Sequence, residues 1–179
     1  FKFQIINNPA VLDNYGTLNR TGVGGGLFEI LLGGHTNYAG SQTIVEDGEL
    51  YASSLDNHAP ITIFSGATFR TYDMRVFDGS SITGGGTFVS NGNGLYMNNN
   101  DLVTVDVAET VMNSQGVKQN GPVNFTQHID WQSGTMLAQV TFTTSCVVDI
   151  NPGSGKGFTN TTINNGTINV NDSFGFDAG

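Results

Sequence analysis

Residues 27–69 read LFEILLGGHTNYAGSQTIVEDGELYASSLDNHAPITIFSGATF, a stretch in which short apolar runs alternate with clusters of glycine, asparagine and serine. The runs Leu27–Leu32, Gln42–Val45 and Ile61–Phe64 have the length of β-strands rather than of helices. Glycine tolerates positive φ and asparagine tolerates the left-handed region, so the clusters between the runs are suited to sharp corners. The stretch predicts short strands joined by tight turns.

A short unit recurs along the chain, in which a glycine, usually followed by a small or polar residue, precedes an apolar residue. Its six copies are Gly16-Thr17-Leu18, Gly48-Glu49-Leu50, Gly66-Ala67-Thr68-Phe69, Gly86-Thr87-Phe88, Gly134-Thr135-Met136 and Gly166-Thr167-Ile168. The glycines at 48, 66 and 86 are 18 and 20 residues apart, a repeat length typical of solenoids. We therefore predict an all-β fold, a parallel β-helix (β-solenoid) with rungs of roughly 20 residues, where a rung is one complete turn of the chain. Inward side chains such as Phe69, Phe88 and Ile168 are expected to form its core.

The composition agrees with strands and turns. Glycine accounts for 25 of the 179 residues and charged residues for only 12 %, while no stretch shows the 3.6-residue periodicity of an amphipathic helix. No proline-rich linker or charge run marks a boundary, so we expect residues 1–179 to be a single solenoid segment, part of a larger chain. Residues 101–149 are less repetitive and are expected to form less regular rungs or a loop excursion.

Charge and cysteine content exclude several classes of function. The net charge of −9 and the scattered basic residues disfavour binding to nucleic acid. The single cysteine, Cys146, stands among apolar and hydroxyl residues and is expected to be a buried small side chain rather than a reactive thiol. No run of about 18 apolar residues is present, so we expect no membrane insertion of this segment.

Within the opening stretch, three motifs stand in an order known from one family. Asn37-Tyr38-Ala39-Gly40, then Asp47-Gly48-Glu49-Leu50, then Ser65-Gly66-Ala67-Thr68-Phe69 resemble the passenger repeats of bacterial autotransporter-like adhesins. The segments 12–19 and 163–170 are similar to rungs of large repetitive bacterial surface proteins. The resemblance implies a β-helix displayed outside the cell as a stalk or an adhesive surface, and it brings no catalytic residues.

Aromatic side chains are the candidates for ligand contact. We expect Tyr72, Tyr96 and Trp131 to point outward and to bind by repeated surface contacts. His128 and Asp130 lie beside Trp131 in a combination of aromatic and acid that fits a sugar-binding groove. The same combination fits a loop packed against the solenoid, and we favour that packing for this segment.

Catalysis is the alternative. Many parallel β-helices cleave polysaccharides with two carboxylates on neighbouring rungs, and the candidates here are Asp101, Asp106, Glu109 and Asp130. Calcium is the ion to consider for an acidic extracellular β-protein, with Asp73–Asp78 and Asn171–Asp172 as oxygen-rich turns. Neither established calcium-loop motif is present, so we assign no metal ligands and no other cofactor.

The sequence thus predicts a secreted or cell-surface solenoid that is structural or adhesive. Its expected partners are a polysaccharide, a host or cell surface, or copies of itself, since unfinished rungs at Phe1–Ile6 and Phe174–Phe176 would need capping. A carbohydrate-active enzyme and a viral fibre or tailspike are the alternatives.

Overall fold

The computed structural model describes residues 2–5, 11–22, 26–31, 34–119, 121–153 and 155–171. In this part the chain forms β-strands and no helix. The strands are β1 (Lys2–Ile5), β2 (Val11–Asn14), β3 (Thr17–Arg20), β4 (Leu27–Ile30), β5 (Gly34–Asn37), β6 (Gln42–Val45), β7 (Glu49–Asn57), β8 (Pro60–Ile63), β9 (Thr68–Val76), β10 (Ser81–Met97), β11 (Val103–Lys118), β12 (Pro122–Phe125), β13 (His128–Met136), β14 (Gln139–Phe142), β15 (Val147–Ile150), β16 (Gly157–Phe158), β17 (Thr162–Asn164) and β18 (Thr167–Val170).

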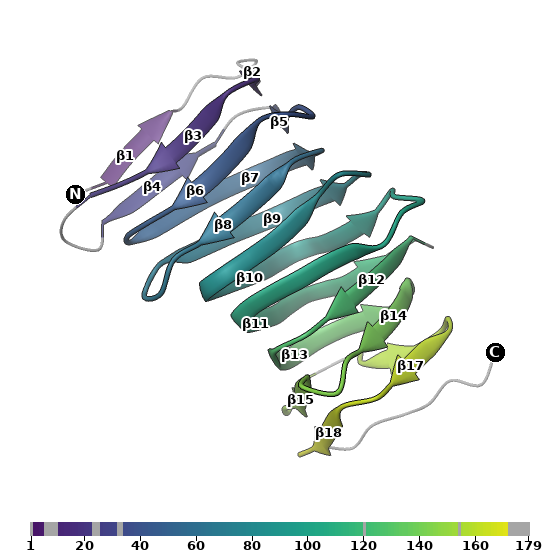
Figure 1. The fold of residues 1–179 in the computed structure, drawn as a ribbon. Coiled ribbons are helices and arrows are strands. Elements are labelled where there is room, and N and C mark those ends of the chain that lie inside the picture. The colour runs from purple at the N-terminus through teal and green to yellow at the C-terminus, as the bar shows by residue number, and fades with distance from the viewer. Residues whose placement is uncertain are drawn as a thin grey trace.

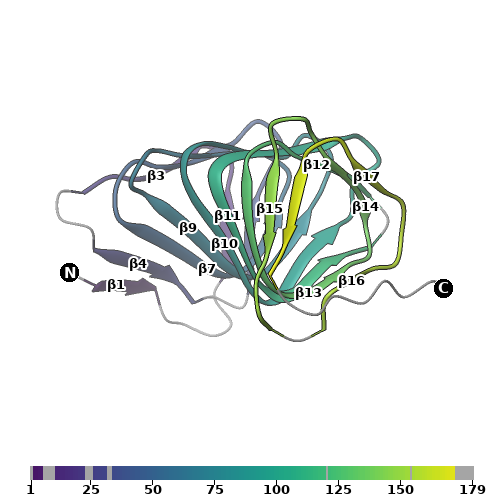
Figure 2. The same cartoon turned by 90° about the horizontal axis from the view of Figure 1, so that it is seen from below.

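The strands stack as a parallel β-solenoid, which confirms the predicted fold. About eight rungs follow one another at intervals of roughly 20 residues. Figure 1 shows the stack running from β1 at one end to β18 at the other, and Figure 2 shows it from below.

Each rung has three faces. Face 1 contains β1, β4, the first halves of β7, β9 and β13, the corresponding parts of β10 and β11, and then β15 and β18. Face 2 contains β2, β5, the second halves of β7, β9 and β13, the ends of β10 and β11, and β16. Face 3 contains β3, β6, β8, the starts of β10 and β11, then β12, β14 and β17.

Side chains alternate between the interior and the surface, as strand geometry requires. On face 1 the equivalent positions Leu50, Phe69 and Phe88 are all fully buried, and the rings of Phe69 and Phe88 stack with centroids 6.0 Å apart. The inward orientation predicted for Phe69 and Phe88 is therefore confirmed. Ile168 packs against the same core but is only partly buried.

The corner between faces 2 and 3 is held by a ladder of asparagines. The Asn37 side chain accepts a hydrogen bond from Asn14 Nδ2 at 3.0 Å and donates through Nδ2 to Asn57 Oδ1 at 2.9 Å. Asn37 and Asn57 are fully buried, so these bonds satisfy amides that would otherwise be costly to bury. Next to this ladder, the rings of Tyr15 and Tyr38 stack with their centroids 4.3 Å apart.

Residues 101–149 take part in the stack. They contribute β11 to β15, and the pairing of β11 with β13 shifts register near Asn113 and Gly116, at the corner between faces 1 and 2. Of the expected end rungs, Lys2–Ile5 forms β1, whereas Phe1, Ile6 and residues 174–176 lie outside the described residues.

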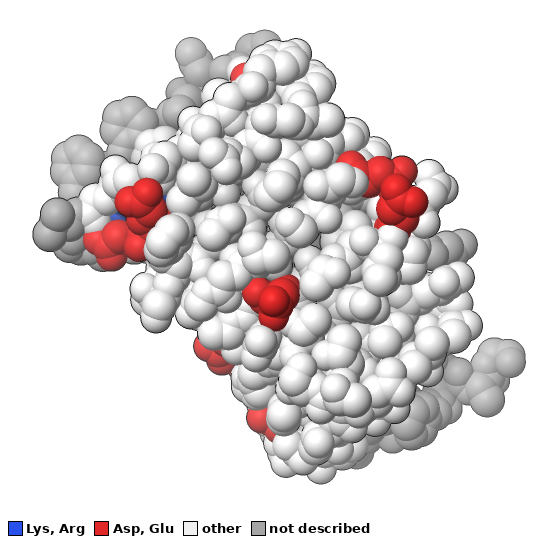
Figure 3. Space-filling view, in the orientation of Figure 1, with Lys and Arg blue, Asp and Glu red and all other residues white. Residues whose placement is uncertain are grey.

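Charge is distributed unevenly over the surface. Figure 3 views face 3 from the front and shows an almost uncharged surface, with carboxylates near its borders and one patch in the middle. Outward positions on this face include Thr62, Thr83 and Thr141, which lie on β8, β10 and β14. The ion pairs Arg70–Glu49 and Arg75–Asp56 lie on faces 1 and 2.

Replacing Phe88 by Asp should unfold the chain. An unpaired charge in this core costs about 3–5 kcal/mol, a large part of the roughly 5–15 kcal/mol that stabilises a typical domain. Thermal melting followed by circular dichroism measures the effect, with Val89→Asp, the next and outward-facing position, as the matched control. Wild-type melting of Phe88→Asp would contradict the register described here.

Stability should fall in acid because of His35. Its side chain is buried on the inner side of β5, and burial lowers the pKa of His35 from 6.5 to about 4. The unfolded chain therefore takes up a proton below about pH 6.5, whereas the folded chain does not until about pH 4, so stability is lost as pH falls through this window. Between pH 7 and 4.5 the free energy of unfolding should fall by about 2–3 kcal/mol less in His35→Leu than in the wild type. Urea unfolding at each pH measures this difference. Equal pH dependence in wild type and variant would show that His35 does not contribute.

Candidate ligand-binding groove

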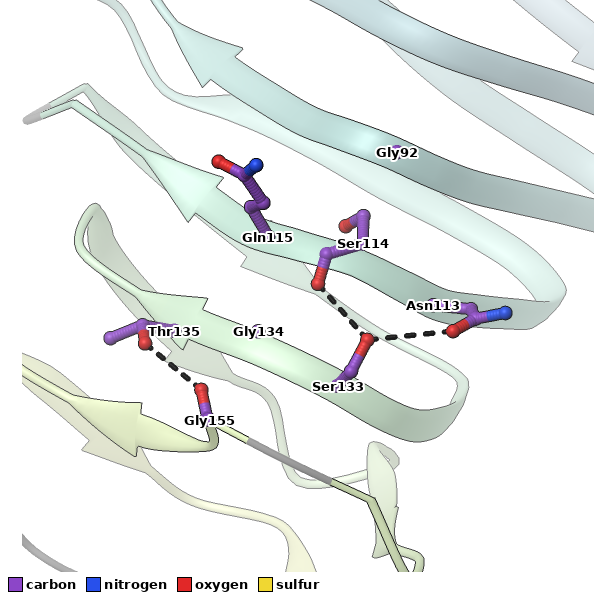
Figure 4. A pocket seen from close by; sticks show the side chains of 8 residues that line it. All are labelled: Gly92, Asn113, Ser114, Gln115, Ser133, Gly134, Thr135 and Gly155. Atoms are coloured by element: carbon purple, nitrogen blue, oxygen red, sulfur yellow. Dashed lines mark hydrogen bonds between the residues drawn. The ribbon is translucent and has the colours of Figure 1, made fainter.

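A hollow of about 460 Å³ opens at the corner where the chain passes from face 1 to face 2. Four successive rungs supply its lining, from β10, β11, β13 and the segment between β15 and β16, so the hollow follows the axis of the solenoid (Figure 4). We call it the corner groove. Its lining residues are Gly92, Asn113, Ser114, Gln115, Ser133, Gly134, Thr135 and Gly155.

Gly92, Gly134 and Gly155 are among the lining residues of the groove, and Gly116 adjoins the lining residue Gln115. Gly116 and Gly134 have φ values of +104° and +93°, which L side chains rarely adopt. A Cβ atom on Gly116 would lie 2.1 Å from the carbonyl oxygen of Thr135, and one on Gly134 would lie 2.2 Å from that of Ser114. The backbones of neighbouring rungs thus approach so closely that no larger residue fits, and the floor is peptide backbone.

The side chains that line the groove are polar and uncharged. Ser133 Oγ donates to the carbonyl oxygen of Ser114 at 3.1 Å and lies 3.4 Å from Asn113 Oδ1, and Thr135 Oγ1 donates to the carbonyl oxygen of Gly155 at 3.1 Å (Figure 4). These bonds link each rung to the next. A few fixed polar groups above a rigid floor are suited to orienting a ligand that carries hydroxyl groups.

Trp131 supports the groove from below. Its side chain is fully buried, and its Nε1 donates to the carbonyl oxygens of Ser133 and Gly134, both at 3.0 Å. The expectation that Trp131 points outward is therefore wrong. Ile129 faces the core, and the alternation of a strand places the residue two positions later on the same side.

Tyr72 lies beside Gly92, the lining residue at the N-terminal end of the groove. Its side chain is 48 % exposed, and a Cβ atom on Gly92 would lie only 2.3 Å from its ring, so the ring rests on the backbone of the next rung. The ring thus combines a fixed position with a large exposed surface. Aromatic rings of this kind are common anchors for ligands that are partly apolar, including the C–H faces of sugars.

Tyr96 reaches the groove through Lys118. The Lys118 ammonium lies 4.9 Å from the centre of the Tyr96 ring, and Nζ is 3.2 Å from the Tyr96 hydroxyl. The same ammonium donates to Oε1 of Gln115, a lining residue, at 2.5 Å. Tyr96 is thus linked to the lining of the groove indirectly, through Lys118 and Gln115.

His128 and Asp130 lie on the outer side of face 1 and do not line the groove. His128 Nε2 is 2.9 Å from Asp149 Oδ2. Asp130 accepts hydrogen bonds from Gln132 Nε2 at 2.7 Å and Asn151 Nδ2 at 2.8 Å. The contacts with Asp149 and Asn151 tie neighbouring rungs together, whereas the contact with Gln132 lies within β13.

Asp130 and Asp149 are paired in register on adjacent rungs, the arrangement expected of a polysaccharide-cleaving site. Hydrogen bonds from Asn169 and His128, however, lower the pKa of Asp149. A general acid for glycoside cleavage needs the opposite shift. The pair is thus better suited to accepting hydrogen bonds than to donating a proton.

The other carboxylates considered for catalysis are dispersed. Asp106 lies on face 3, where hydrogen bonds from Thr126 and Gln127 lower its pKa. Glu109 lies on face 1 on the rung before Asp130, and its Oε1 is 4.0 Å from His128 Nδ1. Asp101 lies in the turn before β11, where its backbone amide donates to Asp78. The structure does not bring these three together.

The possibility of bound calcium finds no support from a cluster of ligands in the described part of the chain. Among the described residues, no group of three or more His, Cys, Asp or Glu side chains is arranged to hold a metal ion. Asp73–Asp78 is not a single turn as expected, because residues 73–76 belong to β9. The backbone amides of Asp101 and Asn100 donate to Asp78, and these bonds lower its pKa. Asp172 lies outside the described residues.

Cys146 is buried, and burial raises the pKa of its thiol to about 12, so the expected unreactive side chain is what the structure shows. Within the described ranges, no helix has the length and apolar character needed to cross a membrane.

Comparisons of the chain with protein-family models, with curated proteins and with solved structures give no match.

Proposed function

We propose that this solenoid belongs to a structural or adhesive protein outside the cell and that it binds a polysaccharide along the corner groove. The observation that carries the proposal is the half-exposed ring of Tyr72 at the head of a groove whose lining is uncharged and polar. An aromatic platform followed by hydroxyl and amide groups matches the chemistry of a sugar chain, which offers C–H faces and hydroxyl groups in turn.

The direction of the groove supports a polymer as the ligand. Its lining residues come from successive rungs, so a chain lying in it would meet a new set of contacts about every 4.8 Å. The floor is rigid backbone held by the hydrogen bonds of Ser133, Thr135 and Trp131. Little ordering of the protein would then oppose binding, and weak contacts can add along the chain.

Location outside the cell is supported by the sequence. The motifs between Asn37 and Phe69 resemble adhesin repeats. The chain has few charged residues, and its polarity comes mainly from asparagine, threonine and serine side chains. Among the expected partners, we choose a polysaccharide over a second copy of the chain because the groove supplies a defined site for it.

Cleavage of a polysaccharide is the second candidate, and the in-register pair Asp130 and Asp149 is the observation in its favour. We rank it below binding because both carboxylates are engaged by side chains of neighbouring residues and the pKa of Asp149 is lowered. Release of new chain ends from a polysaccharide, lost in Asp149→Asn, would reverse this order.

Replacing Tyr72 by Ala should weaken polysaccharide binding about tenfold, which corresponds to about 1.4 kcal/mol. The dissociation constant is measured by titration calorimetry against a panel of purified polysaccharides. Tyr15→Ala is the matched control, because Tyr15 is 70 % exposed but lies at the corner between faces 2 and 3. Equal binding by the two variants would move the site away from the groove, and no binding by the wild type would refute the proposal.

A further inference from the structure

The ammonium group of Lys118 contacts uncharged groups, unlike the side chains of Arg70 and Arg75. Arg70 Nε lies 2.8 Å from Glu49 Oε1, and Arg75 Nη1 lies 3.2 Å from Asp56 Oδ1, so each of these arginines faces a carboxylate. Within the described part of the chain, the contacts of Lys118 are with the Tyr96 ring, the Tyr96 hydroxyl and the Gln115 side chain. In a chain with a net charge of −9, the Lys118 ammonium beside the groove thus has no carboxylate among these contacts.

Hydrogen bonds also fix the position of the Lys118 ammonium group. A lysine ammonium has three N–H donors, and two of them are taken by the Tyr96 hydroxyl and Gln115 Oε1. The Tyr96 ring adds a cation–π contact with the same ammonium. One donor remains for a ligand, and Gln115 holds the group against the wall of the groove.

We infer that the ligand of the corner groove is an anionic polysaccharide, whose acidic sugar group pairs with Lys118 while another sugar of the same chain packs on Tyr72. The inference rests on the proposed function and specifies its substrate class. Tyr72 precedes Gly92 by one rung and Gln115 by two, so the aromatic and the cation are about 10 Å apart along the axis, roughly the length of a disaccharide.

The net negative charge of the chain opposes this ligand at long range but does not decide the contact. At physiological ionic strength, charges separated by more than about 8 Å are largely screened. The lining of the groove carries no formal charge, and the Lys118 ammonium is hydrogen-bonded directly to one lining residue, Gln115. Short-range attraction to Lys118 therefore outweighs the screened repulsion.

The experiment compares Lys118→Gln with Arg75→Gln. Both substitutions make the net charge more negative by one, and both residues point outward from face 2, but Arg75 already faces Asp56. Dissociation constants are measured at 0.15 M salt for a polyuronate, for the same polymer with its carboxyl groups methyl-esterified, and for a sulfated polysaccharide. Melting curves confirm that both variants are folded.

We expect the wild type to bind the polyuronate about tenfold more tightly than its ester, and Lys118→Gln to lose this preference without weaker binding of the ester. Arg75→Gln should keep the preference. Lys118-dependent binding of the sulfated polymer instead of the polyuronate would support the inference and identify the anion as sulfate.

Two results would overturn the inference. One is an equal loss in Lys118→Gln and Arg75→Gln, which would show a general effect of net charge. The other is equal binding of the polyuronate and its ester together with no Lys118-dependent binding of the sulfated polymer. If Tyr72→Ala still weakened binding in that case, the proposed function would stand while this inference fell. Absence of binding to every polymer would instead remove the proposed function itself.

Discussion

The parallel register between successive rungs is the constraint on which the rest of this structure depends. Backbone hydrogen bonds join each strand to the strand one rung away, so equivalent positions stack along the axis. Inside, this alignment places Leu50, Phe69 and Phe88 in one buried column. Outside, it brings Asn113, Ser133 and Gly155 to one corner, although they are far apart in sequence. A shift of one residue would turn every side chain to the opposite side and would remove both the core and the groove.

The fold was predictable because its signals are local. The glycine-led units and the strand-length apolar runs predicted a solenoid of roughly 20 residues per rung, and the structure has that fold. The exposed position of Tyr72 was also predicted. The outward position predicted for Trp131 was wrong, because it was grouped with Tyr72 and Tyr96 as an aromatic side chain available for ligand contact. The alternation that starts from buried Ile129 was the signal that could have placed Trp131 inside.

The groove itself could not be predicted from the sequence. Serine, threonine and glycine occur throughout the chain, so Ser133 or Gly134 carries no distinctive signal. Their assembly depends on how each rung aligns with the next, and the repeat is too degenerate to give that register. The same holds for acidic residues: Asp106 and Glu109 are close in sequence but lie on faces 3 and 1. Lys118 acquires its role only because Tyr96 lies one rung away.

The stacking of rungs also determines how this protein would respond to force. The strands lie across the axis and the hydrogen bonds between them lie along it, so tension along the axis acts directly on the bonds between neighbouring rungs. Each rung contacts only its neighbours, and rungs can therefore separate singly from an end while the others stay folded. One rung of about 20 residues releases roughly 70 Å of extended chain. A solenoid of this kind, held at both ends, would lengthen in steps and dissipate mechanical energy before its attachments broke.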